Sequence, residues 1–336
     1  MLAWQISSFG VDSLEFVERP TPQPGPGEVL VKMHAISLNY RDLLMVKGLY
    51  NPKLKLPRIP CSDGAGEVEA VGGGVTAWKP GDRVVGIFMQ NWLEGALTPI
   101  KARGALGGDI DGTLAEYMVV KQSGLVSLPE YLTFEEAATL PCAAVTAWNA
   151  LAAGNVKPGD SVLVQGTGGV AIFAIQLARL RGARILGISS SNEKLERVSK
   201  LGLDAFLNYK EDPAWDLWAL EQTGGEGVDL VVEVGGAGTL TRSLRALRMG
   251  GVVAQVGVLS SPADPVSFPI ASVLHKQARI QGIYVGSRKD FFELNKAICL
   301  ANLRPVCEVA HYSLAREALK RMEEGGHFGK IVLTVD

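Results

Sequence analysis

Short runs in which hydrophobic and polar residues alternate fill about the first 120 residues of the chain. Three of these runs, at 28–33, 66–71 and 83–87, have the two-residue period of half-buried strands. Glycine and proline turns separate them, such as Lys79-Pro80-Gly81-Asp82 before the third run. The pattern predicts a small β-barrel or sandwich, and the glycine-rich residues 89–113, which show no period, are predicted to form a long loop.

Near residue 133 the pattern changes to apolar strands that alternate with helical segments. Thr133 and Glu136 have the spacing of a capping box that opens a helix. Helical periodicity at 170–181 and 193–201 separates apolar runs, and the strands are predicted at 161–165, 184–189, 205–208, 229–233, 252–256 and 279–285. This alternation predicts an α/β fold with a doubly wound parallel sheet, followed by a helix starting near 314 and a last strand at 330–335.

Composition limits the class of protein. The chain has 336 residues, a formal charge of −2 and 47% hydrophobic residues, which predicts a globular protein of about two domains. The near-neutral charge gives no basic footprint for nucleic acid, and no run of 18 apolar residues predicts a membrane span. Four widely spaced cysteines and a start without a basic, then apolar, leader favour a reducing, cytoplasmic location.

A glycine motif after the first α/β strand indicates a dinucleotide site. It reads G-x-G-x-x-A and contains Gly166, Gly168, Gly169, Val170 and Ala171. Gly166 permits a tight turn, Gly168 removes the Cβ where backbone approaches a pyrophosphate, and Ala171 allows close packing of helix on strand. The helix that follows directs free N–H groups at the phosphates. The alternative interpretation is a glycine-rich turn without a ligand.

The end of the second α/β strand favours NADP(H) over NAD(H). In NAD sites an Asp or Glu at this position binds the ribose 2′-hydroxyl. This chain has Ser189 and Ser190 instead, and Lys194 follows. A carboxylate would repel the 2′-phosphate of NADP, whereas hydroxyls and a cation suit it. The alternative is that Ser190 and Glu193 form a capping box and that Lys194 is a solvated surface residue.

Over nearly its full length the chain resembles the medium-chain dehydrogenase/reductase superfamily, in particular its zinc-independent, quinone-reductase-like members. The segments that carry the resemblance are 24–29, 39–42, 64–68, 81–84, 137–141, 166–171 and 329–332. The resemblance implies a GroES-like catalytic domain at 1–125 and 290–336, built around a Rossmann dinucleotide-binding domain at 126–289. It also implies a homodimer that pairs edge strands, here 279–285.

The resemblance implies further cofactor contacts. Thr146 stands where members of the superfamily meet the nicotinamide side, and Lys330 resembles a residue that reaches the cofactor. Lys330 is alternatively a surface charge. The other implied contacts follow strands, where open α/β sheets bind ligands, and are Gly235, Gly257, Val258 and Gly286.

The chain departs from the zinc alcohol dehydrogenases that it resembles. Those enzymes place a Cys where this chain has Asn39, and a Gly-His-Glu where it has Cys61, Ser62 and Asp63; only Cys142 matches a ligand position. A catalytic zinc needs three protein ligands and an open position. Asp63 offers a carboxylate, but an amide and a hydroxyl are poor ligands. We therefore expect no zinc.

Without a metal, the expected activity is hydride transfer from NADPH to an activated C=C bond, as in a 2-alkenal or enone, or to a quinone. A hydrogen-bond donor near the substrate oxygen is then sufficient. Tyr50 is the first candidate because its Gly-x-Tyr loop resembles that of related reductases, and Asn39 and Tyr40 come next. Tyr50 is alternatively a turn aromatic that packs on the barrel.

Two other functions stay open. One is a zinc-type alcohol dehydrogenase with unusual ligands, and the other is a non-catalytic NADPH-binding structural or regulatory protein. In each case the expected partner is a small molecule rather than nucleic acid or a membrane.

Overall fold

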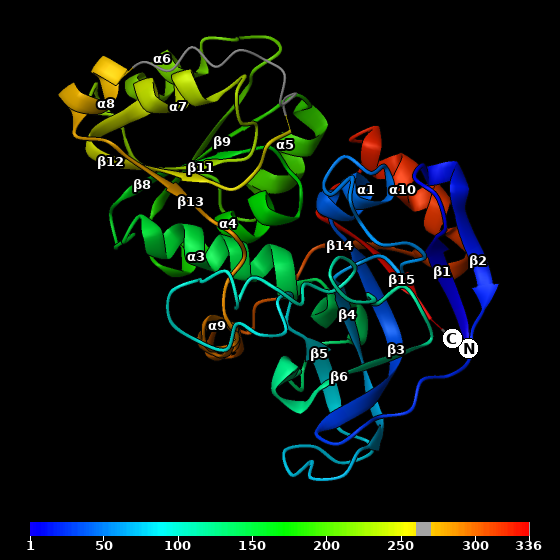
Figure 1. Cartoon of the computed structure of the whole chain (residues 1–336). Coiled ribbons are helices and arrows are strands. Elements are labelled where there is room, and N and C mark those ends of the chain that lie inside the picture. Colours follow the sequence, from blue (N-terminus) through cyan, green and yellow to red (C-terminus); the bar gives the residue numbers. More distant parts are fainter. Residues whose placement is uncertain (260–269, 336) are drawn as a thin grey trace. The chain divides into compact units, whose positions relative to one another are not determined.

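The computed structural model describes residues 1–259 and 270–335 (Figure 1). The chain divides into two compact units: unit 1 is Met1–Val145 with Val285–Asp336, and unit 2 is Thr146–Tyr284. The first border follows residue 145, against an expected 125, and unit 1 resumes at 285, against an expected 290. Unit 1 is therefore discontinuous in sequence, whereas unit 2 is one uninterrupted segment.

Unit 1 contains a seven-stranded sheet in the order β14-β15-β3-β4-β5-β7, with β6 also paired to β3. Its strands are β3 (Glu28–Leu38), β4 (Asp63–Val71), β5 (Arg83–Gly86), β6 (Tyr117–Lys121), β7 (Leu125–Ser127), β14 (Cys307–His311) and β15 (Lys330–Thr334). A separate antiparallel pair joins β1 (Leu2–Ile6) to β2 (Leu14–Glu18). Strand β15 lies between β14 and β3, so both parts of unit 1 form one sheet.

Most helices of unit 1 are short, and most of them pack on this sheet or on each other. They are α1 (Tyr40–Val46), α2 (Phe134–Ala138), α9 (Arg288–Ala301) and α10 (Ala315–Glu323), with single turns η1 (Val11–Ser13), η2 (Gln122–Gly124), η3 (Leu140–Ala144) and η4 (Tyr312–Leu314). Helices α1 and α10 pack together (Figure 1). Thr133 and Glu136 form the predicted capping box of α2.

Unit 2 contains the doubly wound sheet that the sequence predicts. Its six strands, all paired in parallel, run in the order β10-β9-β8-β11-β12-β13. They are β8 (Ser161–Gln165), β9 (Arg184–Ser189), β10 (Ala205–Asn208), β11 (Val228–Glu233), β12 (Leu247–Gln255) and β13 (Arg279–Gly282). The chain order reverses between β8 and β11, which is the dinucleotide-binding topology.

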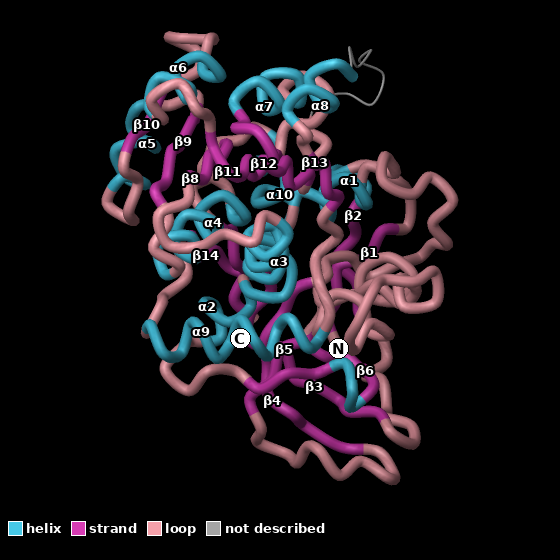
Figure 2. Tube along the Cα trace, turned by 90° about the vertical axis from the view of Figure 1, so that its left-hand side faces the viewer, coloured by secondary structure: helices cyan, strands magenta, loops and turns pink. Residues whose placement is uncertain are grey.

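Helices cover both faces of this sheet (Figures 1 and 2). They are α3 (Val145–Ala153), α4 (Gly169–Leu180), α5 (Asn192–Ser199), α6 (Trp215–Gln222), α7 (Leu240–Ala246) and α8 (Ile270–Lys276). Helices α4 and α5 pack on β8, β9 and β10, whereas α6, α7 and α8 form a second group. Fully buried Leu163, Val231 and Leu244 belong to the apolar core between sheet and helices.

The end of β13 and the N-cap of α5 differ from the predictions. Strand β13 ends at Gly282 instead of residue 285, and Val285 itself has a φ of +58°, which lies outside the range of a strand. The N-cap of α5 is Ser191 instead of Ser190, and its side chain accepts a hydrogen bond from the Lys194 N–H. In the described ranges 1–259 and 270–335, no helix is long and apolar enough to cross a membrane.

Candidate functional site

The glycine motif of unit 2 lies at the point where the strand order reverses. Gly166 follows β8 with a φ of +81°, a left-handed conformation that L-residues rarely adopt. Gly168 is the N-cap of α4, Gly169 and Val170 begin the helix, and Ala171 is buried in its first turn. The N-terminus of α4 presents free N–H groups at this end of the sheet. The arrangement fits the pyrophosphate of a dinucleotide.

A buried polar network joins this motif to the loop after β11. Glu233 is fully buried and accepts hydrogen bonds from the N–H groups of Gly235 (2.7 Å) and Gly236 (3.0 Å) and from Thr239 Oγ1 (2.6 Å). Gln165, the last residue of β8, donates from Nε2 to Glu233 Oε2 at 2.8 Å. Sequence reasoning missed both side chains, although a polar residue that ends an apolar strand is a visible signal.

Gly257 follows β12 where two loops approach closely. A Cβ added there would lie 2.2 Å from the carbonyl oxygen of Val234, so the position requires glycine. The next residue, Val258, is 64% exposed. The loop can therefore present an apolar side chain beside the buried Glu233 network.

Thr146 and Gly286 lie near the borders of the two units. Thr146 is buried in the first turn of α3. The sequence analysis expected Gly286 to follow directly after the last strand of the α/β sheet. In the structure that strand, β13, ends at Gly282, so Gly286 does not follow it directly. Gly286 instead precedes Ser287, the N-cap of α9 in unit 1.

The end of β9 carries hydroxyl groups, as expected for the candidate 2′-phosphate contacts. Ser189 is the last residue of the strand and is buried, whereas Ser190 is half-buried. The capping interpretation of Ser190 and Glu193 is wrong because Ser191 caps the helix. Lys194 is half-buried in the first turn of α5.

A carboxylate that the sequence analysis did not consider lies close to these hydroxyls. Glu211, after β10, accepts hydrogen bonds from the side-chain amides of Asn192 (2.5 Å) and Asn208 (3.1 Å). Asn192 begins α5 and Asn208 ends β10, so Glu211 lies at the same end of the sheet as Ser189. Its carboxylate opposes a 2′-phosphate and suits a ribose hydroxyl.

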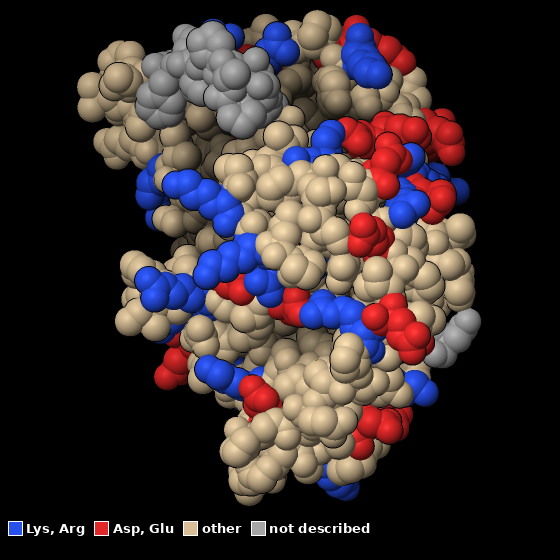
Figure 3. Space-filling model, turned by 45° about the vertical axis from the view of Figure 1, so that its right-hand side comes forward, with Lys and Arg blue, Asp and Glu red and all other residues tan. Residues whose placement is uncertain are grey.

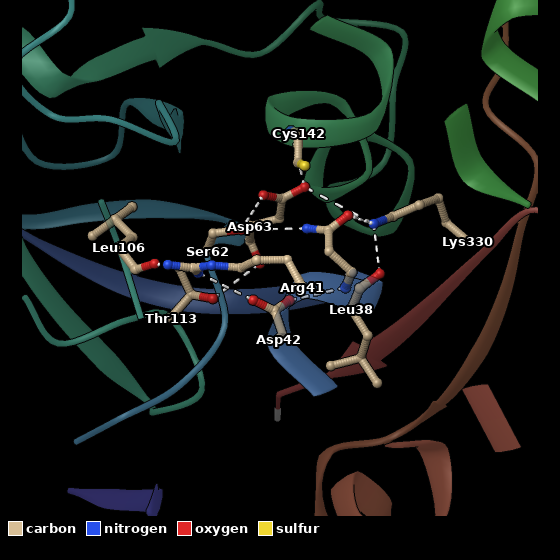
Figure 4. Close-up of polar contacts among 10 residues, drawn as sticks. Leu38, Arg41, Asp42, Ser62, Asp63, Leu106, Thr113, Cys142 and Lys330 are labelled. Carbon is tan, nitrogen blue, oxygen red and sulfur yellow. Dashed lines mark hydrogen bonds and ion pairs between the residues drawn. The ribbon is translucent and has the colours of Figure 1, made fainter. Parts of the chain in front are cut away.

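In unit 1 a second polar cluster contains Ser62, Asp63, Cys142 and Lys330 (Figure 4). Asn39 bridges Ser62 and Lys330 in this cluster. Asn39 is the N-cap of α1, and its backbone N–H is bound by Asp42, three residues on, at 2.9 Å. The Asn39 side chain also takes part in the cluster. Its Nδ2 donates to Ser62 Oγ at 3.3 Å, and its Oδ1 accepts from the ammonium of Lys330.

Asp63 is fully buried at the start of β4 and links Ser62 to Cys142. Its Oδ1 accepts from Ser62 Oγ at 2.8 Å, and its Oδ2 accepts from the Cys142 N–H at 3.0 Å. Cys142 lies in η3, a π-helical turn, and such turns are frequent at functional sites. Burial raises the pKa of Asp63 to about 6, although the nearby Lys330 ammonium opposes the shift. Burial also raises the pKa of the Cys142 thiol.

Lys330, the first residue of β15, is buried with a relative exposure of 4%. Its ammonium donates to the Leu38 carbonyl at 2.6 Å and to Asn39 Oδ1, and it lies 4.0 Å from Asp63 Oδ2. The surface-charge interpretation of Lys330 is therefore wrong. The ammonium belongs to the polar cluster of unit 1.

Arg41 connects the cluster to Tyr50. Its Nη1 donates to the Leu106 carbonyl at 2.7 Å and forms an ion pair with Asp42 at 3.3 Å. The guanidinium also stacks on two aromatic rings, 5.7 Å from the centre of Tyr50 and 5.0 Å from that of Phe88. Tyr50 is 41% exposed, so its ring rests on Arg41 while part of it reaches the surface. Tyr40, the other candidate, is 38% exposed at the start of α1.

The residues of this cluster do not fit a zinc ion. Across residues 1–259 and 270–335, no three His, Cys, Asp or Glu side chains gather into a possible metal site. The Asn39 oxygen is engaged by Lys330, and both Asp63 oxygens accept hydrogen bonds. Zinc binds thiolates and neutral imidazoles, and it would face a fixed ammonium here.

The face drawn in Figure 3 carries both signs of charge side by side. Surface ion pairs such as Lys47–Glu323, Lys320–Asp12 and Arg321–Glu308 reflect this mixing. The absence of a nucleic-acid partner stays a prediction from the sequence.

Comparisons with known proteins agree with this architecture. Residues 25–130 match the alcohol dehydrogenase GroES-like domain, and residues 169–299 match a family described as zinc-binding dehydrogenase. A zinc-type alcohol dehydrogenase-like protein of Schizosaccharomyces pombe is 44% identical over 97% of this chain and 96% of its own. An acryloyl-coenzyme A reductase of Metallosphaera sedula is 30% identical over 95% and 96%.

A solved structure agrees as well. The crystal structure of a putative alcohol dehydrogenase from Sinorhizobium meliloti 1021 has a TM-score of 0.91 and 38% identity, and covers 99% of this chain and 98% of its own. The fold, the glycine motif and the sequence similarity agree. The chain therefore belongs to the medium-chain dehydrogenase/reductase superfamily of nicotinamide-dependent oxidoreductases, among its zinc-type alcohol dehydrogenase-like members.

Proposed function

We propose that this oxidoreductase reduces activated C=C bonds, as in 2-alkenals and enones, or quinones, with NADPH and without zinc. The observation that carries the proposal is the cluster around Asn39, in which an ammonium and an amide stand among side chains that do not fit a metal. The relative named acryloyl-coenzyme A reductase supports it, because an acryloyl group is a C=C bond conjugated to a carbonyl.

The residues of unit 1 supply what such a reduction needs apart from hydride. A bound reduced nicotinamide would supply the hydride, and the G-x-G-x-x-A turn would hold its pyrophosphate. Negative charge then develops on the substrate oxygen, and a positioned N–H or O–H donor stabilises it. Asn39 donates one Nδ2 proton to Ser62, and its second Nδ2 proton would be the donor to the substrate oxygen. The ring of Tyr50 is oriented by Arg41. Tyr50 would donate the proton to the reduced product.

The choice of NADPH rests on Ser189, Ser190 and Lys194 at the end of β9. Glu211 is the observation that favours NADH instead, since its carboxylate lies at the same end of the sheet. We propose that the hydroxyls and Lys194 dominate. Exchange of Glu211 for Gln should therefore change NADPH affinity by less than about threefold.

The test combines cofactor titration, a substrate panel and metal analysis. We expect NADPH to bind at least about tenfold more tightly than NADH, and turnover with enals, enones or quinones. Purified protein should contain well under one zinc per chain. Oxidation of simple alcohols by protein with stoichiometric zinc would contradict the proposal. Tight NADPH binding without turnover on the whole panel would favour a regulatory protein.

Tyr50→Phe tests the proton donor within the same assay. We expect kcat to fall by about 10²-fold with NADPH affinity unchanged. Tyr117→Phe is the matched control, because Tyr117 is half-buried in β6 of unit 1 and pairs with Lys32, away from the end of β3 that leads to Asn39. An unchanged rate for Tyr50→Phe would remove this residue from the mechanism.

A further inference from the structure

Three buried charges meet in unit 1: the ammonium of Lys330 and the carboxylates of Asp42 and Asp63. The Lys330 side chain is 4% exposed, and both carboxylates are fully buried. Burial of charges is strongly unfavourable unless they are paired and hydrogen-bonded. Arg41, a second basic residue beside these carboxylates, pairs with Asp42. Lys330 therefore remains as the counter-charge of Asp63.

The ammonium also sets the orientation of Asn39. Because the ammonium only donates hydrogen bonds, the Asn39 oxygen must face Lys330 and the amide nitrogen must face Ser62. The Leu38 carbonyl, 2.6 Å from Nζ, fixes the other side of the ammonium. Lys330 thus contacts Asn39 directly and lies 4.0 Å from Asp63, whose carboxylate binds Ser62 and the Cys142 N–H. Asn39, Ser62 and Cys142 take the metal-ligand positions of the superfamily.

We propose that the ammonium of Lys330 is the permanent cation of this cluster and holds the place that a divalent metal ion would need. This inference rests on the proposed function without zinc and attributes the exclusion of zinc to one residue, Lys330. A metal ion placed among Asn39, Ser62 and Cys142 would lie within a few ångströms of Nζ, where like charges repel strongly in a buried site. Lys330 is therefore a positioning residue, which orients Asn39 and neutralises Asp63.

The test compares variants that restore the missing metal ligands, with Lys330 either kept or replaced by Met. Asn39→Cys/Ser62→His supplies a thiol and an imidazole beside Cys142. We expect this double variant to remain a poor metal binder, and the triple variant with Lys330→Met to bind about one zinc per chain. The expected difference in zinc affinity is at least about 100-fold. Cobalt(II), whose thiolate absorption bands report the ligand set, gives a readout independent of activity.

The matched control adds Lys320→Met to the double variant. Lys320 is 51% exposed and pairs with Asp12, so its removal takes away one charge without touching the cluster. This control should bind metal no better than the double variant. Equal zinc affinity in the double and triple variants would overturn the inference, as would a folded triple variant that binds neither metal.

Folding of the variants is part of the same prediction. Lys330→Met alone should lower the melting temperature, because Asp63 loses its counter-charge, and zinc should restore it in the triple variant. If the triple variant fails to fold in the presence of zinc, the inference is contradicted, because the metal then does not replace the ammonium. Zinc found in the wild-type chain would instead refute the proposed function.

Discussion

Asp63 shows how one buried side chain gives the site a pH dependence. Burial raises its pKa to about 6, the Lys330 ammonium opposes this shift, and the hydrogen bond from Ser62 Oγ opposes it as well. Since the folded state then binds a proton that the unfolded state releases, Asp63 lowers stability as pH rises from about 4 to about 6. Asp42, whose pKa burial also raises, acts in the same direction.

Asp63→Asn should remove this dependence. At pH 4 the Asp63 carboxyl of the folded wild type is already protonated and neutral, so the variant loses no ion pair there and its free energy of unfolding should be close to that of wild type. The difference in the free energy of unfolding between the two proteins should then shift in favour of the variant by up to about 3 kcal/mol between pH 4 and pH 7. Urea titrations at several pH values measure it. A constant difference across that range would show that the carboxyl group does not titrate near 6.

Single residues of the cluster could be predicted from the sequence, but their contacts could not. Asn39 and Cys142 stand out because they occupy ligand positions in the superfamily. Lys330 is 291 residues from Asn39, and no local pattern indicates that its ammonium turns toward Asn39. Cys61 is a similar case: its φ of +71° fits the glycine of the resembling enzymes, yet only the structure shows Gly107 and Gly112 packed against its backbone.

At the scale of elements, Gln165 and Glu233 tie the ends of β8 and β11 together. Gln165 Nε2 donates to Glu233 Oε2 and to Ser243 Oγ, while Gln165 Oε1 accepts from the Val234 N–H at 3.2 Å. All of these groups are close to the reversal point of the sheet. The pair therefore fixes the two loops that flank the candidate pyrophosphate site.

Exchanging the two side chains tests this role. Gln165→Glu alone brings two buried carboxylates together, and Glu233→Gln alone makes two amide nitrogens face each other. Each should cost about 2–4 kcal/mol of stability and weaken NADPH binding. The double variant Gln165→Glu/Glu233→Gln restores a donor opposite an acceptor at every contact, so it should recover at least half of both losses. Losses that simply add would show that the two side chains do not act as a pair.

Element boundaries show where periodicity stops being informative. The strands β8, β9 and β10 match the predicted ranges because each is a continuous apolar run that ends at a turn. Strand β13 ends at Gly282, and Val285, inside the predicted range, adopts a left-handed backbone that the apolar pattern does not reveal. Strand β3 continues to Leu38, beyond the predicted end at 33, because β4 and β15 both pair with its second half.

At the scale of the whole molecule, unit 1 depends on both ends of the chain. Strand β15 pairs with β3 along Ile331–Thr334 and with β14 on its other side. Without β15, strand β3 would lose its partner on one side from Ala35 to Leu38, and the Lys330 ammonium would be lost. Unit 2, which is continuous in sequence, has no such dependence on the C-terminal strand.

Leu333→Ala should therefore weaken unit 1 and leave the sheet of unit 2 intact. Leu333 is fully buried in the core of unit 1, so the cavity should cost about 2–5 kcal/mol. Hydrogen exchange should accelerate in peptides from β3, while peptides from β8 and β11 keep their protection. Leu300→Ala, at a position 92% exposed, is the control and should change neither. Equal loss of protection in β3 and β8 would mean that the two units unfold as one cooperative body, despite their separate cores.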